Sequence, residues 1–106
     1  MPNNTLKLVL TDHWFDEIKS GRKMHEYRKA TPFWYRRLLS YRRRTTLRNS
    51  LGAVIARPLV QFQKAYRKNP ERMTFEINRI TIIGGEHTDL KCVEDVFDIE
   101  LGRRIK

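Results

Sequence analysis

Residues 21–28, Gly-Arg-Lys-Met-His-Glu-Tyr-Arg, mark the point where the hydrophobic pattern of the chain changes from helical to extended. The preceding segment, Thr11–Ser20, has helical spacing and is predicted to form a short helix that Asp12 caps. Gly21 follows directly, at the position after a helix where a positive φ is favoured. A strand over Met24–Lys29 is predicted next. We therefore expect a helix-to-strand turn that presents several charged side chains.

The alternation of a strand divides the charged residues of this turn between two faces. Glu26 and Arg28 share one face, and His25 and Tyr27 share the other. Lys23 falls on the second face if it already belongs to the strand, so it meets Glu26 only if it lies in the turn. The stretch is therefore either a polar site or an ordinary connection that its own charges stabilise.

The size and composition of the chain predict a single domain covering residues 1–106. Hydrophobic residues make up 40% of the sequence, enough for a folded protein. The longest nearly apolar stretch, Leu51–Val60, is interrupted by Arg57 and Pro58 and is too short to span a bilayer. Cys92 is the only cysteine, which excludes an internal disulfide and favours a reducing compartment. We therefore expect a cytoplasmic protein without membrane association.

The net charge of +10 comes from one region of the chain. The 44 residues between Glu26 and Glu71 contain 12 Lys or Arg and no acid, whereas the rest of the chain carries 10 basic and 12 acidic residues. Such a segment favours a polyanionic partner. Because no long amphipathic helix with a basic face and an apolar face is predicted, nucleic acid is favoured over a membrane surface.

The remaining pattern predicts an α+β fold. Thr31 and Pro32 are typical of a helix N-cap and first turn, and the segment Phe33–Thr46 has helical periodicity. Residues 64–72 are predicted to form a basic loop, and Gly84-Gly85 a turn. The predicted strands are Leu6–Leu10, Leu51–Ala56 (continued or followed by Leu59–Phe62), Met73–Ile77, Arg79–Ile83 and Val96–Leu101. Short strands at this spacing indicate a small, curled, barrel-like sheet with two or three helices.

The second predicted helix carries an arginine cluster. Six arginines fall within residues 36–48, and no acid lies among them to form ion pairs. The cluster is either a solvated helix face or a phosphate-binding surface, and the absence of acids favours phosphate contact. Trp34, Leu38 and Tyr41 form one stripe, which is typical of core residues. Trp34, Tyr35 and Tyr41 are also candidates for base stacking.

Several segments taken together resemble the ASCH family, whose members have a PUA-like fold. Residues 6–38, LKLVLTDHWFDEIKSGRKMHEYRKATPFWYRRL, are similar to that family's opening strand, helix and G-x-K-x-x-E-x-R motif. The T-P-x-W-x-x-R-L pattern within them resembles a subgroup found in phage and prophage genomes. Ala65 departs from the subgroup, which has glycine there. Two later stretches are also similar to that subgroup: one that includes Phe62, Tyr66, Met73, Phe75, Glu76 and Ile80, and the closing FDIELGRRI.

The resemblance implies a PUA-like small curled mixed β-barrel and RNA binding in a cleft lined by the motif residues. One branch of the family is an acetylcytidine amidohydrolase, which uses a lysine and a threonine of its version of the motif and a downstream glutamate. Lys23 matches the lysine, whereas Glu26 stands at the threonine position, so the nucleophile of that branch is missing here. Other members resemble ribonucleases.

Three functions are compatible with the sequence. In an RNA- or modified-nucleotide-binding protein, Lys23 and Arg28 contact phosphate or a carbonyl, and Glu26 accepts hydrogen bonds from a base. In a hydrolase acting on RNA or on a modified nucleoside, Glu26 is the general base and Lys23 stabilises an oxyanion. The third function is that of a phage-encoded regulator of a host protein. Alternatively, these three side chains form a charge cluster with a purely structural role.

The candidate catalytic residues are Lys23 and Glu26. For Glu76 two roles are open, a cross-strand ion pair with an arginine and a position in the cleft, and we expect the ion pair. We expect no cofactor and no metal, because the histidines lack ligand spacing and Gly84-Gly85 lacks the context of a phosphate loop. The candidate residues for contact with RNA, single-stranded nucleic acid or a modified nucleotide are Lys23, Glu26, Arg28, Trp34, Arg36, Arg37, Arg42, Arg43, Arg44, Tyr66 and Glu76.

Overall fold

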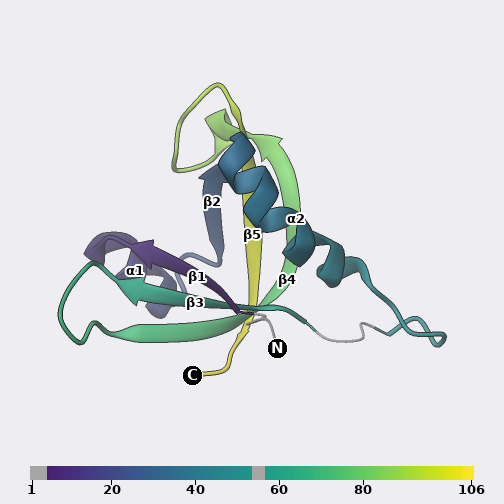
Figure 1. Cartoon of the computed structure of the whole chain (residues 1–106). Helices are drawn as coiled ribbons and strands as arrows, with labels where there is room; N and C mark the ends of the chain where they lie inside the picture. Colours follow the sequence, from purple (N-terminus) through teal and green to yellow (C-terminus); the bar gives the residue numbers. More distant parts are fainter. Residues whose placement is uncertain (1–4, 54–56) are drawn as a thin grey trace.

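The computed structural model describes residues 5–53 and 57–106, which form a curled mixed sheet with two α-helices (Figure 1). The elements in chain order are β1 (Thr5–Leu10), α1 (Asp12–Lys19), β2 (His25–Lys29), α2 (Pro32–Thr46), β3 (Leu59–Lys64), β4 (Arg72–Gly84), the 3-10 turn η1 (Gly85–His87) and β5 (Asp95–Arg104). The predicted α+β class is confirmed.

The sheet has the strand order β1-β3-β4-β5-β2, with β1 parallel to β3 and the other neighbours antiparallel. β1 and β2 are its two edges, so the curled, barrel-like sheet that the sequence predicts is an open half-barrel. The curl comes from β4, whose first half pairs with β3 and whose second half pairs with β5 (Figure 1).

β4 corrects the prediction of two strands, Met73–Ile77 and Arg79–Ile83. The two segments form one strand with register shifts between Phe75 and Arg79, where it passes from one partner to the other. A bulge of this kind bends a strand and increases its twist. The interruption that the sequence shows at Asn78 is therefore a bend within a strand and not a strand end.

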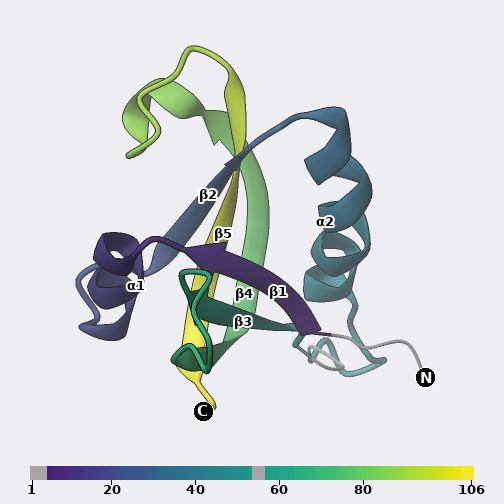
Figure 2. The same cartoon turned by 60° about the vertical axis from the view of Figure 1, so that its left-hand side comes forward.

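One cluster of buried hydrophobic residues joins the strands β1, β3, β4 and β5 to both helices. α1 contributes Phe15 and Ile18, and α2 contributes Leu38, with Trp34 and Tyr41 packed against the cluster. The predicted α2 stripe is thus confirmed as a core-facing stripe. The helices lie apart from each other, α1 against β1 and β3 and α2 against β4 (Figures 1 and 2).

The helix boundaries follow local signals. The Thr31 side chain accepts a hydrogen bond from the Trp34 N–H, and Pro32 is the first residue of α2, as predicted. Gly21 follows α1 with φ +84°, also as predicted. Asp12 is not the cap of α1: Thr11 holds the N-cap position, and Asp12 lies in the first turn. Among the described residues, neither helix combines the length and the apolar character needed to cross a bilayer.

The prediction of a strand over Leu51–Ala56 is wrong for its first three residues. Residues 51–53 form a turn and irregular chain, and the Leu51 side chain is exposed. Residues 54–56 lie outside the described part of the chain. The strand that was expected to continue this segment, Leu59–Phe62, is β3 and extends to Lys64. Apolar composition alone misled the prediction, because residues 51–53 have no neighbouring strand to cover them.

Candidate functional site

The motif residues lie where the two edges of the half-barrel approach each other. β2 carries Glu26 and Arg28, and the Arg28 guanidinium reaches across to β1, where its Nη2 donates to the Val9 carbonyl oxygen at 3.4 Å. Arg37 of α2 donates in the same way to the Lys7 carbonyl oxygen of β1 at 2.8 Å. Arginine side chains therefore donate hydrogen bonds to carbonyl groups of the edge strand β1 that would otherwise be free to pair with the backbone of another strand.

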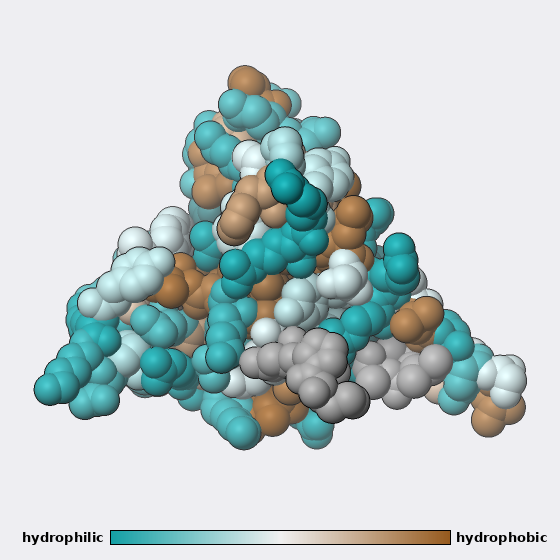
Figure 3. Space-filling model, viewed as in Figure 1, coloured by the Kyte–Doolittle hydropathy of each residue, from teal (hydrophilic) through white to brown (hydrophobic). Residues whose placement is uncertain are grey.

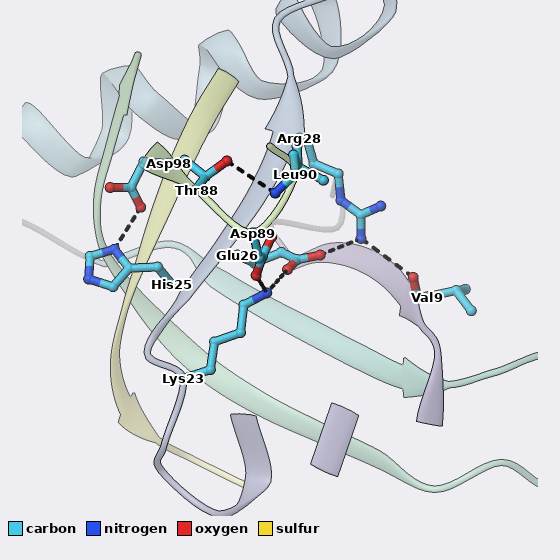
Figure 4. A network of polar contacts seen from close by, with 9 residues as sticks. All are labelled: Val9, Lys23, His25, Glu26, Arg28, Thr88, Asp89, Leu90 and Asp98. Atoms are coloured by element: carbon cyan, nitrogen blue, oxygen red, sulfur yellow. Dashed lines mark hydrogen bonds and ion pairs between the residues drawn. The ribbon is translucent and has the colours of Figure 1, made fainter. Parts of the chain in front are cut away.

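Three motif side chains form a row of alternating charge (Figure 4). The Glu26 carboxylate is 8% exposed and lies between two cations, with Oε1 3.2 Å from Lys23 Nζ and Oε2 2.8 Å from Arg28 Nη2. Lys23 precedes β2 and belongs to the turn after Gly21. The condition for Lys23 and Glu26 to meet is therefore fulfilled, because a lysine outside the strand is not bound to its alternation.

Each cation of the row lies over a tryptophan ring. Lys23 Nζ is 4.1 Å from the ring centroid of Trp14 in α1, and the Arg28 guanidinium carbon is 5.3 Å from that of Trp34 in α2. The Arg37 guanidinium carbon is 5.6 Å from the same Trp34 ring. These cation–π contacts add to the ion pairs and hold the cations against two walls of the site.

A fourth charged residue comes from the loop between η1 and β5. Asp89 forms an ion pair with Lys23, so Lys23 bridges two carboxylates (Figure 4). The side chains of Lys23 and Asp89 are 12% and 23% exposed. The loop that carries Asp89 thus covers one side of the motif.

The other face of β2 carries an aromatic and acidic patch. The His25 and Tyr27 rings lie parallel with centroids 6.2 Å apart, and His25 Nδ1 lies 2.7 Å from Asp98 Oδ1 of β5. Burial raises the pKa of the Tyr27 phenol, and the carboxylates of Asp98, Asp89 and Glu26 raise it further.

The row lines a narrow pocket with a wider pocket on each side. The central pocket, about 170 Å³, lies between β1, α1, β2 and the Asp89 loop. It shares Lys23, Trp14, Tyr27 and Asp89 with a pocket of about 360 Å³, and Arg28 and Val9 with one of about 350 Å³. We use the term cleft for the residues that line these three pockets.

The structure brings some predicted site residues to the cleft and separates others from it. Trp34, Arg37 and Tyr66 line the same side pocket as Arg28, and the Tyr66 ring is exposed. Glu76 does not line the cleft and forms the expected cross-strand ion pair, with its Oε1 3.2 Å from Arg103 Nε.

The arginine cluster of α2 is also divided. Arg37 lines the cleft, whereas Arg42 and Arg43 line a different pocket beside β4. Arg36 donates to the Pro32 carbonyl oxygen at 3.5 Å, and Arg44 lies over the Tyr41 ring. The helix distributes consecutive arginines around its axis at about 100° per residue, so they do not form a single surface.

Sequence reasoning missed Trp14 and Asp89. Trp14 lies in the helix that precedes the motif, and its contact with Lys23 depends on the turn that folds the motif back onto that helix. Asp89 is 63 residues from Glu26 in sequence, in a loop without a recognisable pattern. Only the pairing of β5 with β2 brings that loop to the motif.

Comparison with family models, with curated proteins and with solved structures gives no match for this chain. Among residues 5–53 and 57–106, no group of three or more His, Cys, Asp or Glu side chains is placed to hold a metal ion. The cleft offers an anchored carboxylate, the cations of Lys23, Arg28 and Arg37, two tryptophans and the carbonyl groups of an edge strand.

Proposed function

We propose that this protein binds single-stranded RNA or a modified nucleotide in the cleft, as the resemblance to the PUA-like ASCH family implies. The observation that carries the proposal is the position of Glu26. Its carboxylate is buried between Lys23 and Arg28 in a pocket with aromatic walls at the open edge of the sheet. A base with exocyclic N–H groups meets an acceptor there, and its phosphate meets cations.

The size of the cleft supports a splayed-out nucleotide as ligand. The central pocket of about 170 Å³ is smaller than the 300 Å³ or more that is typical of sites for drug-sized molecules. The two wider pockets on either side provide room for the neighbouring sugar and phosphate groups. A nucleotide within a strand has a small planar base, and its charged sugar–phosphate chain continues on both sides. The narrow central pocket and the two wider side pockets match this shape.

Arg28 supplies a second argument. Among the described residues, its buried Nε is the one buried side-chain nitrogen or oxygen atom without a hydrogen-bond partner. Buried donors are almost always paired, so an unpaired one needs an acceptor from elsewhere. If the Arg28 side chain turns to expose this donor to the cleft, a carbonyl or phosphate oxygen of a ligand can accept its hydrogen bond.

A titration of fluorescently labelled single-stranded RNA with wild type and a Lys23→Ala/Glu26→Gln variant tests the proposal. We expect the variant to bind at least about tenfold more weakly, since the loss of about 1.4 kcal/mol corresponds to that factor. The matched control is Lys19→Ala/Glu71→Gln, which removes an exposed Lys–Glu ion pair that does not line the cleft. If the cleft variant and the control bind RNA equally well, the cleft is not the binding site.

The second candidate function is hydrolysis of RNA or of a modified nucleoside. The observation in its favour is the 3.2 Å distance between Lys23 Nζ and Glu26 Oε1, which places an acid–base pair beside one pocket. Against it, both carboxylate oxygens already contact cations. Incubation with acetylcytidine and with an RNA oligonucleotide distinguishes the two functions: turnover by wild type that Glu26→Gln abolishes supports an enzyme, and no turnover by wild type argues against one.

A further inference from the structure

A second basic surface lies on the side of α2 that faces β4. Two adjoining pockets of about 340 and 350 Å³ share Thr45, Thr46 and Arg79 and form one groove. The arginines that line it are Arg42, Arg43, Arg48, Arg57 and Arg79, and the one acid among its lining residues is Glu100. We use the term arginine groove for this surface. In Figure 3, hydrophilic residues lie along α2 on the face shown, interspersed with hydrophobic ones.

The arginine groove is separate from the cleft. An α-helix advances about 1.5 Å and turns about 100° per residue, so Arg42 lies about 140° around the helix axis from Arg37. Arg37 lines the cleft, and Arg42 lines the groove. α2 therefore stands between the two surfaces and contributes cations to both.

The groove is held in place by contacts with the backbone. Arg42 Nε donates to the Ile80 carbonyl oxygen of β4 at 3.2 Å, which fixes the guanidinium against the sheet. Arg48 Nη1 donates to the carbonyl oxygens of Thr45 and Leu47 at 3.1 and 3.3 Å. Carbonyls at a helix C-terminus repel anions, and these bonds neutralise part of that effect. Arg42 and Arg48 thus make the end of α2 compatible with a bound anion.

The lining residues distinguish the groove from the cleft in chemical terms. The cleft contains Trp14, Tyr27, Trp34 and Tyr66, whereas the described lining of the groove contains no aromatic residue. Without a surface for stacking, the groove does not suit a base. Arginine forks match the geometry of phosphate oxygens, and the +10 charge of the chain is concentrated in the segment that supplies four of the five arginines.

We propose that the arginine groove is a phosphate-backbone site, and that it holds the same nucleic acid strand whose base enters the cleft. The identity of the ligand rests on the proposed function, whereas the affinity of the groove for a chain of phosphates does not. The cleft recognises a base, and the groove contributes a sequence-independent electrostatic contact. Such a contact makes binding steeply dependent on salt.

The test uses an Arg43→Gln/Arg79→Gln variant. Both side chains are exposed, and they line the groove from its two sides, Arg43 from α2 and Arg79 from β4. The matched control is Arg72→Gln/Arg104→Gln, which removes the same charge from two exposed arginines that line neither surface. Two probes are titrated at several salt concentrations: a labelled single-stranded RNA and inorganic polyphosphate, which has a phosphate chain and no bases.

We expect the groove variant to lose about tenfold in affinity for both probes, a larger loss than the control shows. Its salt dependence for RNA falls by about 0.7 in slope for each lost phosphate contact. The cleft variant Lys23→Ala/Glu26→Gln keeps its affinity for polyphosphate and loses that for RNA. Circular dichroism and thermal unfolding establish that each variant is folded.

The outcomes separate the two proposals. If the groove variant matches the control with both probes, the groove is not a phosphate site, whether or not wild type binds RNA. If wild type binds polyphosphate through the groove and does not bind RNA, the proposed function fails and the phosphate site stands. If wild type binds neither probe, both proposals are overturned.

Discussion

Arg28 and Glu26 stand two residues apart on one face of β2, with Arg28 Nη2 2.8 Å from Glu26 Oε2, and the pair fills the opening between the two edge strands. The same guanidinium reaches Val9 on the opposite edge. A sheet that closed by pairing β1 with β2 would have no room for these charges. The open edge of the half-barrel and the charged row therefore belong together.

The buried carboxylate of Glu26 is expected to contribute to stability. Glu26→Gln leaves Lys23 and Arg28 in a poorly hydrated site without their shared anion, so we expect a loss of about 1–3 kcal/mol in the free energy of unfolding. Glu76→Gln is the control, because its partner Arg103 is 78% exposed and such surface pairs contribute about 0–1 kcal/mol. Urea unfolding measures both, and equal losses would mean that the row contributes no more than a surface pair.

Asp89 is expected to compete with an anionic ligand for Lys23. If the proposed function is correct, Asp89→Asn removes a negative charge from the cleft and strengthens RNA binding by about two- to fivefold, as expected for a partly exposed ion pair. Glu86→Gln removes an acid from the neighbouring 3-10 turn, where it does not line the cleft, and serves as control. An unchanged or lower affinity of Asp89→Asn would show that Asp89 positions Lys23 and does not compete for it.

The two consecutive glycines at the end of β4 are expected to differ in their tolerance of substitution. A Cβ on Gly85 would clash with Cys92 Sγ and lie 2.6 Å from the Glu94 carbonyl oxygen, whereas one on Gly84 would contact nothing within 4 Å. Gly85→Ala should therefore cost about 1–3 kcal/mol, because the backbone of the Asp89 loop has to move. Gly84→Ala should change stability by less than about 1 kcal/mol. Thermal unfolding of both variants checks this, and similar melting temperatures would contradict it.

Ala65 adopts a conformation that favours glycine. Its φ is +58°, at the position where the resemblance led us to expect glycine, and its N–H donates to the Leu10 carbonyl oxygen at 2.8 Å. Relief of the left-handed strain should make Ala65→Gly more stable by about 0.5–1 kcal/mol. Ala30→Gly, at a position without positive φ that packs against the core, should be destabilising. Opposite signs in chemical unfolding are the expected result, and a loss of stability in both variants would refute the explanation.

Two ion pairs should make the stability decline as the pH falls below about 5. Both pairs join α1 to the segment that connects β3 and β4. A hydrogen bond from Arg67 lowers the pKa of Asp12, and one from Lys19 lowers the pKa of Glu71. A carboxylate whose pKa is lower in the folded state stabilises the fold above its unfolded pKa, and this contribution is lost as the pH falls through the folded pKa. Asp12→Asn/Glu71→Gln should therefore flatten the decline in stability between about pH 5 and pH 2. Both side chains are exposed, so high salt should reduce the difference.

The local parts of this structure were predictable because their signals lie within a few residues of each other. Gly21, Thr31 and Pro32 set the helix ends, and the period of apolar residues predicted α1, β2, α2 and the stripe that α2 buries. The sequence also indicated that Lys23 can meet Glu26 only from the turn, and it left open whether Lys23 lies in the turn or in the strand. In the structure Lys23 lies in the turn and meets Glu26. These features depend on backbone preferences and on side-chain periodicity, which are properties of the sequence alone.

The tertiary structure decided which of these residues form a site. Trp14 reaches the motif only because the turn after Gly21 folds Lys23 back onto α1, and Asp89 reaches it only because β5 pairs with β2. Strand pairing and packing also decided three other features. They joined the two predicted strands into β4, left β1 and β2 as open edges, and divided the arginines between the cleft and the arginine groove. A periodic pattern specifies which face of a helix or strand is apolar. Which other element packs against that face depends on the total apolar surface that the whole chain buries, and a local stretch of sequence does not determine this.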